Sequence, residues 1–104
     1  MPSVRFPITG LYRVEVSGWD KNEAFFVEKS DMEWNEGSGK RVKLSNAVPD
    51  GAVIFLRWLQ SLRTEPTRPV PYEAEFLAVT PDGQSQFRLH PVIARAVGHN
   101  ASVN

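Results

Sequence analysis

Few residues of this 104-residue chain have the types and spacing that catalytic or metal sites require. The chain has no Cys and two His, so thiolate chemistry and a His-rich metal site are excluded. A serine nucleophile would need His90 or His99 as its base, but no G-x-S-x-G turn is present. His99 lies near the C-terminus, and His90 precedes Pro91 at the end of a strand-like run. The sequence therefore predicts a protein that is not an enzyme, and it indicates no cofactor or metal.

Two pairs of carboxylates have a spacing that could serve acid–base chemistry. Asp31 and Glu33 form one pair, and Glu73 and Glu75 form the other. Residues two apart on a strand lie on the same face, so each pair would share a surface. Both pairs alternate with apolar neighbours, however, which is typical of a strand face in water. We predict surface positions for both pairs.

The segment 35–40, Asn-Glu-Gly-Ser-Gly-Lys, has the glycines and the lysine of a phosphate-binding loop. The Walker spacing is absent, and no helical pattern follows the segment. Gly-Ser-Gly between two strand-like runs favours a simple turn.

Aromatic and basic side chains offer a further possibility, because barrels bind single-stranded nucleic acids by stacking bases on aromatic rings beside cations. Trp34 and Trp58 are expected in the core or at a barrel end, whereas Trp19 lies in a predicted turn, where core and surface positions remain equally open. Lys plus Arg and Asp plus Glu both number 12, and this neutral balance argues against a general nucleic-acid binder. The arginines that could flank the tryptophans are Arg41, Arg57, Arg63, Arg68 and Arg88.

The elements that must position these residues are predicted to be strands. Apolar and polar residues alternate with period two in separate runs, and Gly-, Pro- and Asn-rich turns divide the runs. No helical periodicity holds for ten residues before Ile93. The near-continuous apolar run Val53–Leu56 predicts a strand that is central in the barrel or covered on both faces. We predict an all-β fold, a small six-stranded antiparallel barrel, in which strands run over Leu11–Ser17, Ala24–Trp34, Arg41–Leu44, Ala52–Leu59, Tyr72–Val79 and Ser85–Ile93.

The whole chain is predicted to be one domain, with a core over about residues 10–93. Residues 1–9 are expected to form an extended arm and residues 94–104 a tail or a short helix. The segment Ser61–Pro71 contains three prolines and predicts a long loop. No secretory leader and no run of about 18 apolar residues is present, which favours a cytoplasmic protein.

The order of these features resembles the PilZ domain, a family of small six-stranded barrels of bacteria. The resemblance runs from Val14 to Leu77 and is carried by short pieces of strand and turn, the last of which extends to Val79. These pieces are Val16-Ser17-Gly18-Trp19-Asp20, Phe26-Val27-Glu28-Lys29-Ser30, Val48-Pro49-Asp50-Gly51-Ala52-Val53-Ile54-Phe55-Leu56 and Tyr72-Glu73-Ala74-Glu75-Phe76-Leu77-Ala78-Val79.

PilZ domains typically bind cyclic di-GMP with an R-x-x-x-R arm before the first strand and a D/N-x-S-x-x-G motif after the second. This chain has Arg5 and Arg13 without that spacing. After Asn35, Gly37 stands where the serine is expected, and Gly39 comes one residue early. The resemblance therefore implies a degenerate member that lacks the usual cyclic di-GMP motifs.

Three hypotheses follow for function. The first is a non-enzymatic bacterial regulatory module that binds a protein partner. The second is binding of cyclic di-GMP or another nucleotide by a rearranged site, with Arg5 and Arg13 on phosphate or guanine and Asn35 on a base edge. The third is single-stranded nucleic-acid binding through Trp19 and nearby arginines. The residues of the rearranged site would be Arg5, Arg13, Asn35, Ser38 and Arg41.

Overall fold

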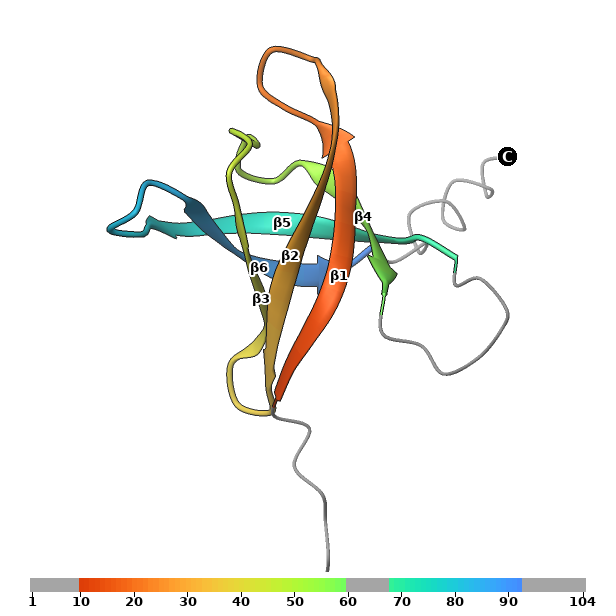
Figure 1. The fold of residues 1–104 in the computed structure, drawn as a ribbon, viewed down its shortest axis with the longest axis vertical. Coiled ribbons are helices and arrows are strands. Elements are labelled where there is room, and N and C mark those ends of the chain that lie inside the picture. The colour runs from red at the N-terminus through yellow and green to blue at the C-terminus, as the bar shows by residue number, and fades with distance from the viewer. Residues whose placement is uncertain (1–9, 60–67, 93–104) are drawn as a thin grey trace, which may run out of the picture.

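The computed structural model describes residues 10–59 and 68–92, and these residues form a closed antiparallel barrel without a helix (Figure 1). The predicted all-β, six-stranded barrel is confirmed. The predicted arm 1–9 and tail 94–104 lie outside the described residues. The strands are β1 (Gly10–Trp19), β2 (Phe25–Asn35), β3 (Gly39–Leu44), β4 (Val53–Trp58), β5 (Val70–Val79) and β6 (Ser85–Pro91).

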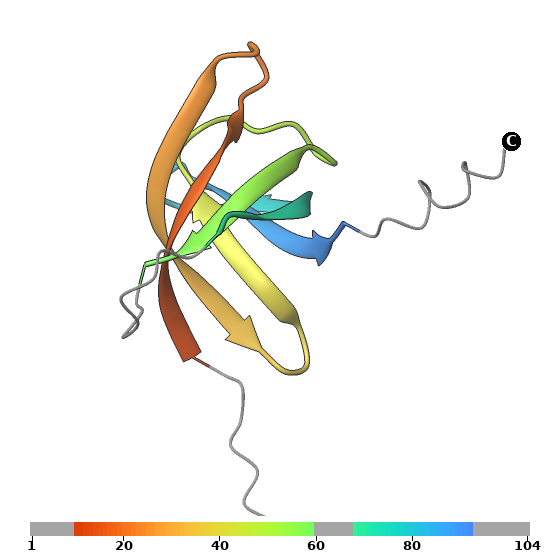
Figure 2. The ribbon, with the colours of Figure 1, turned by 90° about the vertical axis from the view of Figure 1, so that its right-hand side faces the viewer.

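Two three-stranded meanders make the barrel. β1, β2 and β3 follow one another in the sheet, as do β4, β5 and β6, and the order around the barrel is β1-β2-β3-β6-β5-β4. The pairs β3–β6 and β1–β4 close the two meanders on each other (Figure 2). The far end of the β1–β2 hairpin projects beyond the body of the barrel (Figure 1).

The period-two alternation that predicted the strands also fills the barrel. On β1, Val14 and Val16 point inward and are fully buried, whereas Arg13 and Glu15 face outward. Phe87 of β6 is the largest fully buried side chain. The other core residues are Phe26, Met32, Val42, Leu44, Val48, Ile54, Leu56, Tyr72, Ala74 and Leu89.

Several predicted strand ends were wrong, and β3, for example, begins at Gly39 and not at Arg41. Trp19 is the last residue of β1, paired with Phe25, and does not lie in the turn. β5 begins at Val70 and includes Pro71, which was assigned to the preceding loop. Pro71 is tolerated because it lies near the start of the strand, before the pairing with β6 begins at Tyr72. β6 ends at Pro91, and Ile93 and loop residues 60–67 lie outside the described residues.

β4 is covered on only one face, which corrects one of the two interpretations of its apolar run. The strand is central in the sheet because it pairs with β1 and with β5. Ile54 and Leu56 are fully buried inside the barrel, but the alternate residue Val53 is 44% exposed. The outer face of β4 is therefore accessible, and it is apolar at Val53 and Phe55.

An aromatic cluster closes one end of the barrel core. Tyr12 packs edge-on against Trp34 and Trp58, with ring centroids 6.0 and 5.1 Å apart. The Lys40 ammonium lies 4.2 Å from the Trp34 ring centroid, a cation–π contact. The expected core or barrel-end role of Trp34 and Trp58 is thus confirmed, since both pack against the core.

Burial raises the pKa of the Tyr72 phenol, because the phenolate would lose hydration there.

Candidate functional site

The outer face of the β1–β2 hairpin and the adjacent β4 strand carries an exposed apolar surface, called here the apolar patch. Trp19 stands opposite Phe25 at the hairpin end, and one row further along Ser17 lies between Val27 of β2 and Phe55 of β4. Trp19, Phe25 and Val27 are 52%, 57% and 55% exposed. The members of the apolar patch are Trp19, Phe25, Val27, Val53 and Phe55.

Local geometry fixes the apolar patch in place. The Trp19 and Phe25 rings pack edge-to-face with centroids 5.2 Å apart, the favourable arrangement for aromatic pairs. Beneath them, Gly18 lets β1 approach β4 closely, because a Cβ there would lie 3.3 Å from the Ile54 Cγ2 atom. The turn beyond Trp19 is held by Asp20, whose carboxylate accepts hydrogen bonds from the Asn22 and Ala24 amides. The patch therefore rests on an ordered hairpin.

Next to the apolar patch, the same outer face becomes charged. Glu15 accepts a hydrogen bond from Arg57 Nε at 3.0 Å, and a terminal nitrogen of the same guanidinium forms an ion pair with it at 2.9 Å. One row further, Arg13 donates to Asp31 at 3.1 Å. Both are directly opposed cross-strand pairs, which give small contributions to stability in water. Lys29 lies opposite Glu15 on the β2 side.

β2 and β3 diverge along this face, and polar side chains bridge the gap between them. Their ladder extends only from Asn35↔Gly39 to Met32↔Val42. Beyond it, the Ser30 hydroxyl donates to the Lys43 carbonyl at 2.7 Å. The Glu28 carboxylate then accepts from the Ser45 amide at 2.7 Å and from the Asn46 amide at 3.2 Å. Side chains thus replace the missing backbone ladder.

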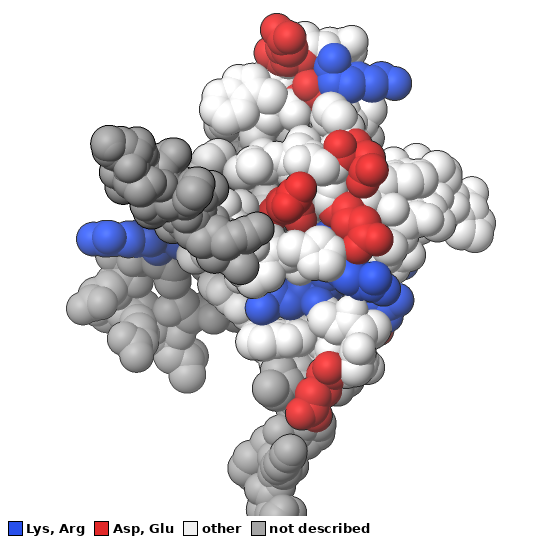
Figure 3. All heavy atoms as spheres, turned by 180° about the vertical axis from the view of Figure 1, so that it is seen from behind, with Lys and Arg blue, Asp and Glu red and all other residues white. Residues whose placement is uncertain are grey.

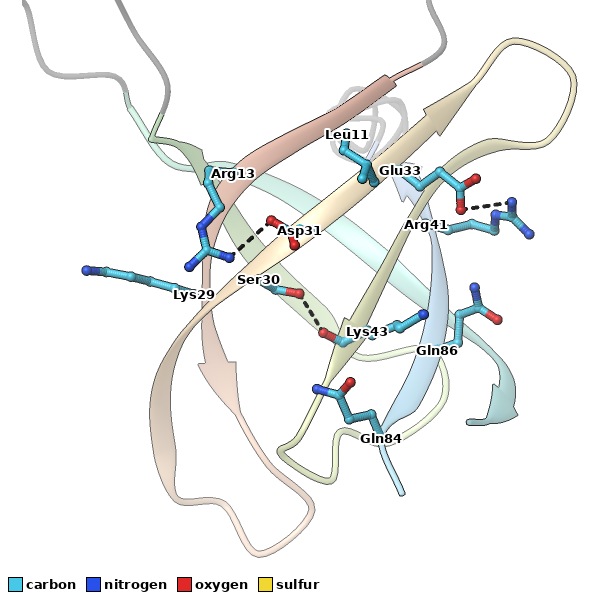
Figure 4. A pocket seen from close by; sticks show the side chains of 10 residues that line it. All are labelled: Leu11, Arg13, Lys29, Ser30, Asp31, Glu33, Arg41, Lys43, Gln84 and Gln86. Atoms are coloured by element: carbon cyan, nitrogen blue, oxygen red, sulfur yellow. Dashed lines mark hydrogen bonds and ion pairs between the residues drawn. The ribbon is translucent and has the colours of Figure 1, made fainter. Parts of the chain in front are cut away.

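The divergence leaves a depression of about 400 Å³ on the outer face, called here the groove. Figure 4 shows Arg13, Lys29 and Asp31 on the β2 side and Arg41, Lys43 and Gln86 on the side of β3 and β6. The remaining lining residues are Leu11, Ser30, Glu33 and Gln84.

The lining of the groove is cationic in a chain whose formal net charge is zero. Four cations and two carboxylates line it, which leaves an excess of two positive charges (4 − 2 = 2). Both carboxylates already pair with arginines, Asp31 with Arg13 and Glu33 with Arg41, each at 3.1 Å. Within the described part of the chain, Lys29 and Lys43 form no ion pair.

A pair of arginines lies at the edge of the groove. Arg41 of β3 and Arg88 of β6 are register partners, an arrangement in which like charges repel. Each has a carboxylate on its far side, Glu33 for Arg41 and Glu75 for Arg88. The two Nε atoms are buried and have no hydrogen-bond partner in the described structure.

The five residues of the predicted nucleotide site do not come together in the described part of the chain. Arg5 lies outside it, and only Arg13 and Arg41 line the groove. The Asn35 side chain is engaged in its own turn, where its Oδ1 accepts from the Gly37 amide at 2.8 Å and the Ser38 amide at 3.2 Å. These amides are consequently not available to a phosphate, and the turn expected for segment 35–40 is confirmed.

The other candidate residues occupy ordinary surface positions. His90 is exposed and lies 2.8 Å from the Glu75 carboxylate, which also faces Arg88 at 3.6 Å. Among the described residues, no group of three or more His, Asp or Glu is placed to hold a metal ion. Nor does this part of the chain include a helix long and apolar enough to cross a membrane.

The side of the molecule that faces away from the viewer in Figure 1 carries both signs of charge. Acidic clusters lie there above a row of basic side chains (Figure 3). Trp19 is exposed enough to stack on a base, but its register partner and ring contact is Phe25 and not an arginine. A base-stacking platform, in contrast, typically has basic residues beside its aromatic rings.

Phe25, Val27, Lys29 and Lys43 were not singled out from the sequence as site residues. One signal was available: Phe25 and Val27 share a strand face with Lys29, Asp31 and Glu33, so two large apolar residues stand on an otherwise charged face.

Comparison of the chain with family models, with curated proteins and with solved structures gave no significant match.

Proposed function

We propose that this barrel is a non-enzymatic interaction module that binds a protein partner through the apolar patch. The observation that carries the proposal is the exposure of Trp19, Phe25 and Val27 together on one projecting hairpin. Contiguous exposed apolar surface with a polar border is a feature of protein-binding sites, and Trp is among the residues enriched at their energetic centres. The charged rows beside the patch supply such a border.

The proposal also includes a regulatory role in the bacterial cytoplasm, which the resemblance to PilZ domains implies. It is supported by the order of the sequence pieces and by the six-stranded barrel that the family implies. The structural role of Asn35 in its turn supports a member that does not bind cyclic di-GMP in the usual mode.

A nucleotide is the second candidate ligand, favoured by one observation: Arg13 and Arg41 line the same groove. Titration calorimetry with cyclic di-GMP tests it, with Arg13→Ala as the control variant. Micromolar affinity that is lost in this variant would support nucleotide binding, whereas the absence of heat would leave the protein partner as the function.

The protein-binding proposal predicts opposite outcomes for two matched substitutions. A displayed library of random peptides is selected on the immobilised chain, and enriched peptides are measured against Val27→Asp and Val79→Asp. Both valines are exposed on strands, at 55% and 63%, but only Val27 belongs to the apolar patch. Val27→Asp should weaken binding at least tenfold, about 1.4 kcal/mol, because it places a charge in the contact. Val79→Asp should change affinity less than twofold.

Two outcomes contradict the proposal. One is the failure of any peptide to be enriched above background. The other is an equal loss of affinity in the two variants, which would show that binding does not depend on the apolar patch. Urea unfolding of both variants checks that neither substitution has lost the fold.

A further inference from the structure

We infer that the partner segment carries carboxylates beside its apolar residues, and that these carboxylates bind in the groove at Lys29 and Lys43. The inference rests on the proposed function and extends it to the chemistry of the partner. It follows from the continuity of the two surfaces and from the uncompensated charge of the groove.

The apolar patch and the groove are continuous along β2. Phe25, Val27, Lys29 and Asp31 are successive outward residues of this strand, and the first two belong to the apolar patch and the last two to the groove. Alternate residues of a strand are about 7 Å apart. A segment lying along β2 in an extended conformation would therefore pass from Val27 to Lys29 within about two residues.

The groove contains two lysines without an ion-pair partner in the described structure, whereas both of its carboxylates are paired with arginines. Asp31 and Glu33 are each held by an arginine at 3.1 Å, so they do not neutralise the lysines. Glu15, the register partner of Lys29, is likewise held by Arg57. A carboxylate of a partner could therefore pair with the Lys29 or Lys43 ammonium group without breaking an existing ion pair.

Lys43 and the neighbouring arginines add to this preference. Lys43 is exposed and lies across the gap from Ser30. The Ser30 hydroxyl donates to the backbone carbonyl of Lys43, and the Lys43 ammonium group forms no ion pair in the described structure. The pKa of Asp82 is lowered mainly by the hydrogen bond from the Thr80 hydroxyl, and the positive charge of Lys43 lowers it only to a smaller extent. The opposed Arg41 and Arg88 keep the adjacent row positive at its centre.

The groove fits carboxylates on a polypeptide better than a free phosphate. The side chains that line it project from strands (Figure 4), whereas a phosphate is typically held by a cluster of backbone amides. The amides of the nearby Asn35–Gly39 turn are engaged by Asn35 itself. Affinity should therefore depend on contact with the apolar patch at the same time.

The experiment uses the peptides enriched on the native chain and reverses the charge of the groove. We expect these peptides to be rich in Asp and Glu next to apolar residues. The double variant Lys29→Glu/Lys43→Glu should lose at least tenfold in affinity, and binding to the native chain should weaken as salt is raised. Lys21→Glu is the control, because Lys21 lies in the hairpin turn beyond Trp19, at the opposite end of the apolar patch. It should change affinity less than threefold.

The outcomes separate this inference from the function on which it rests. Peptides that depend on Val27 but show no acidic bias, and that bind the double lysine variant unchanged, would overturn the inference and leave the proposed function standing. Failure to enrich any peptide would overturn both. Inorganic phosphate and pyrophosphate, titrated in parallel, should not bind at millimolar concentration. Tight binding of either one that is lost in the double lysine variant would replace the acidic segment by a phosphate ligand.

Discussion

Phe87→Ala should lower the free energy of unfolding by about 3–5 kcal/mol. Phe87 is fully buried and is the largest such side chain in the barrel. Removal of its ring would leave a cavity between strands that are paired on both sides, so the walls cannot collapse freely. Domains of this size are stable by about 5–15 kcal/mol. Urea unfolding of the variant and of the native chain measures the difference.

Phe76→Ala is the matched control for this prediction. The Phe76 ring packs edge-on against Phe87 with centroids 5.9 Å apart, but Phe76 lies beyond Tyr72 and Ala74 on the inner face of β5, where it is 42% exposed. The same substitution should therefore cost less than half as much there. Phe87→Leu, which keeps more of the side-chain volume, should lie between the two. Equal losses at positions 76 and 87 would contradict the barrel interior described here.

Glu28→Gln should cost about 1–3 kcal/mol of stability, although Glu28 is only half-buried. One carboxylate oxygen accepts from the Ser45 amide, and the other accepts from both the amide and the side chain of Asn46. A glutamine amide would set an N–H group against one of these donors and would remove the charge that strengthens all three bonds. The loss should appear in the urea midpoint and as faster hydrogen exchange at the Ser45 amide.

Glu73→Gln provides the comparison for Glu28. Glu73 is an exposed carboxylate on β5 for which the described structure shows no hydrogen bond or ion pair. Its substitution should change stability by less than about 0.5 kcal/mol. If Glu28→Gln is as neutral as this control, the bridge across the gap between β2 and β3 does not hold the barrel together.

The architecture could be predicted because period-two alternation is a local property of the chain. Tyr12, Val14 and Val16 share one face in the sequence pattern, and the same face is the interior of β1. Pro-Asp-Gly at 49–51 and 81–83 predicted turns, and both glycines have the positive φ that such turns favour, 86° for Gly51 and 90° for Gly83.

What the sequence could not show depends on pairing between distant strands. Glu28 and Ser30 interrupt the apolar face of the predicted strand Ala24–Trp34, and the alternation does not show what these two polar side chains contact. Their role emerges only when β3 diverges and the chain after Lys43 needs hydrogen-bond partners. Trp19 was misplaced because strand pairing with Phe25 extends β1 into a segment that reads as a turn.

The candidate site was predictable only in fragments for the same reason. Arg13 and Arg41 were named from the sequence, and they do line one groove. The nucleotide hypothesis expected Asn35 and Ser38 to contact a ligand, but both take part in the local turn, since an Asn side chain commonly accepts from the backbone amide two residues further on. The apolar patch gathers residues from β1, β2 and β4, and no local pattern brings β4 beside β1.

Site-specific photo-cross-linking in living cells is the most direct test of the claim that the apolar patch binds a protein. Benzoylphenylalanine replaces Phe25 in one version of the chain and Phe76 in another, because both phenylalanines are exposed, at 57% and 42%, and only Phe25 belongs to the apolar patch. We expect position 25 to give one defined cross-linked protein that disappears when Val27→Asp is added, and position 76 to give none. No cross-link from position 25, or the same products from both positions, would contradict the account.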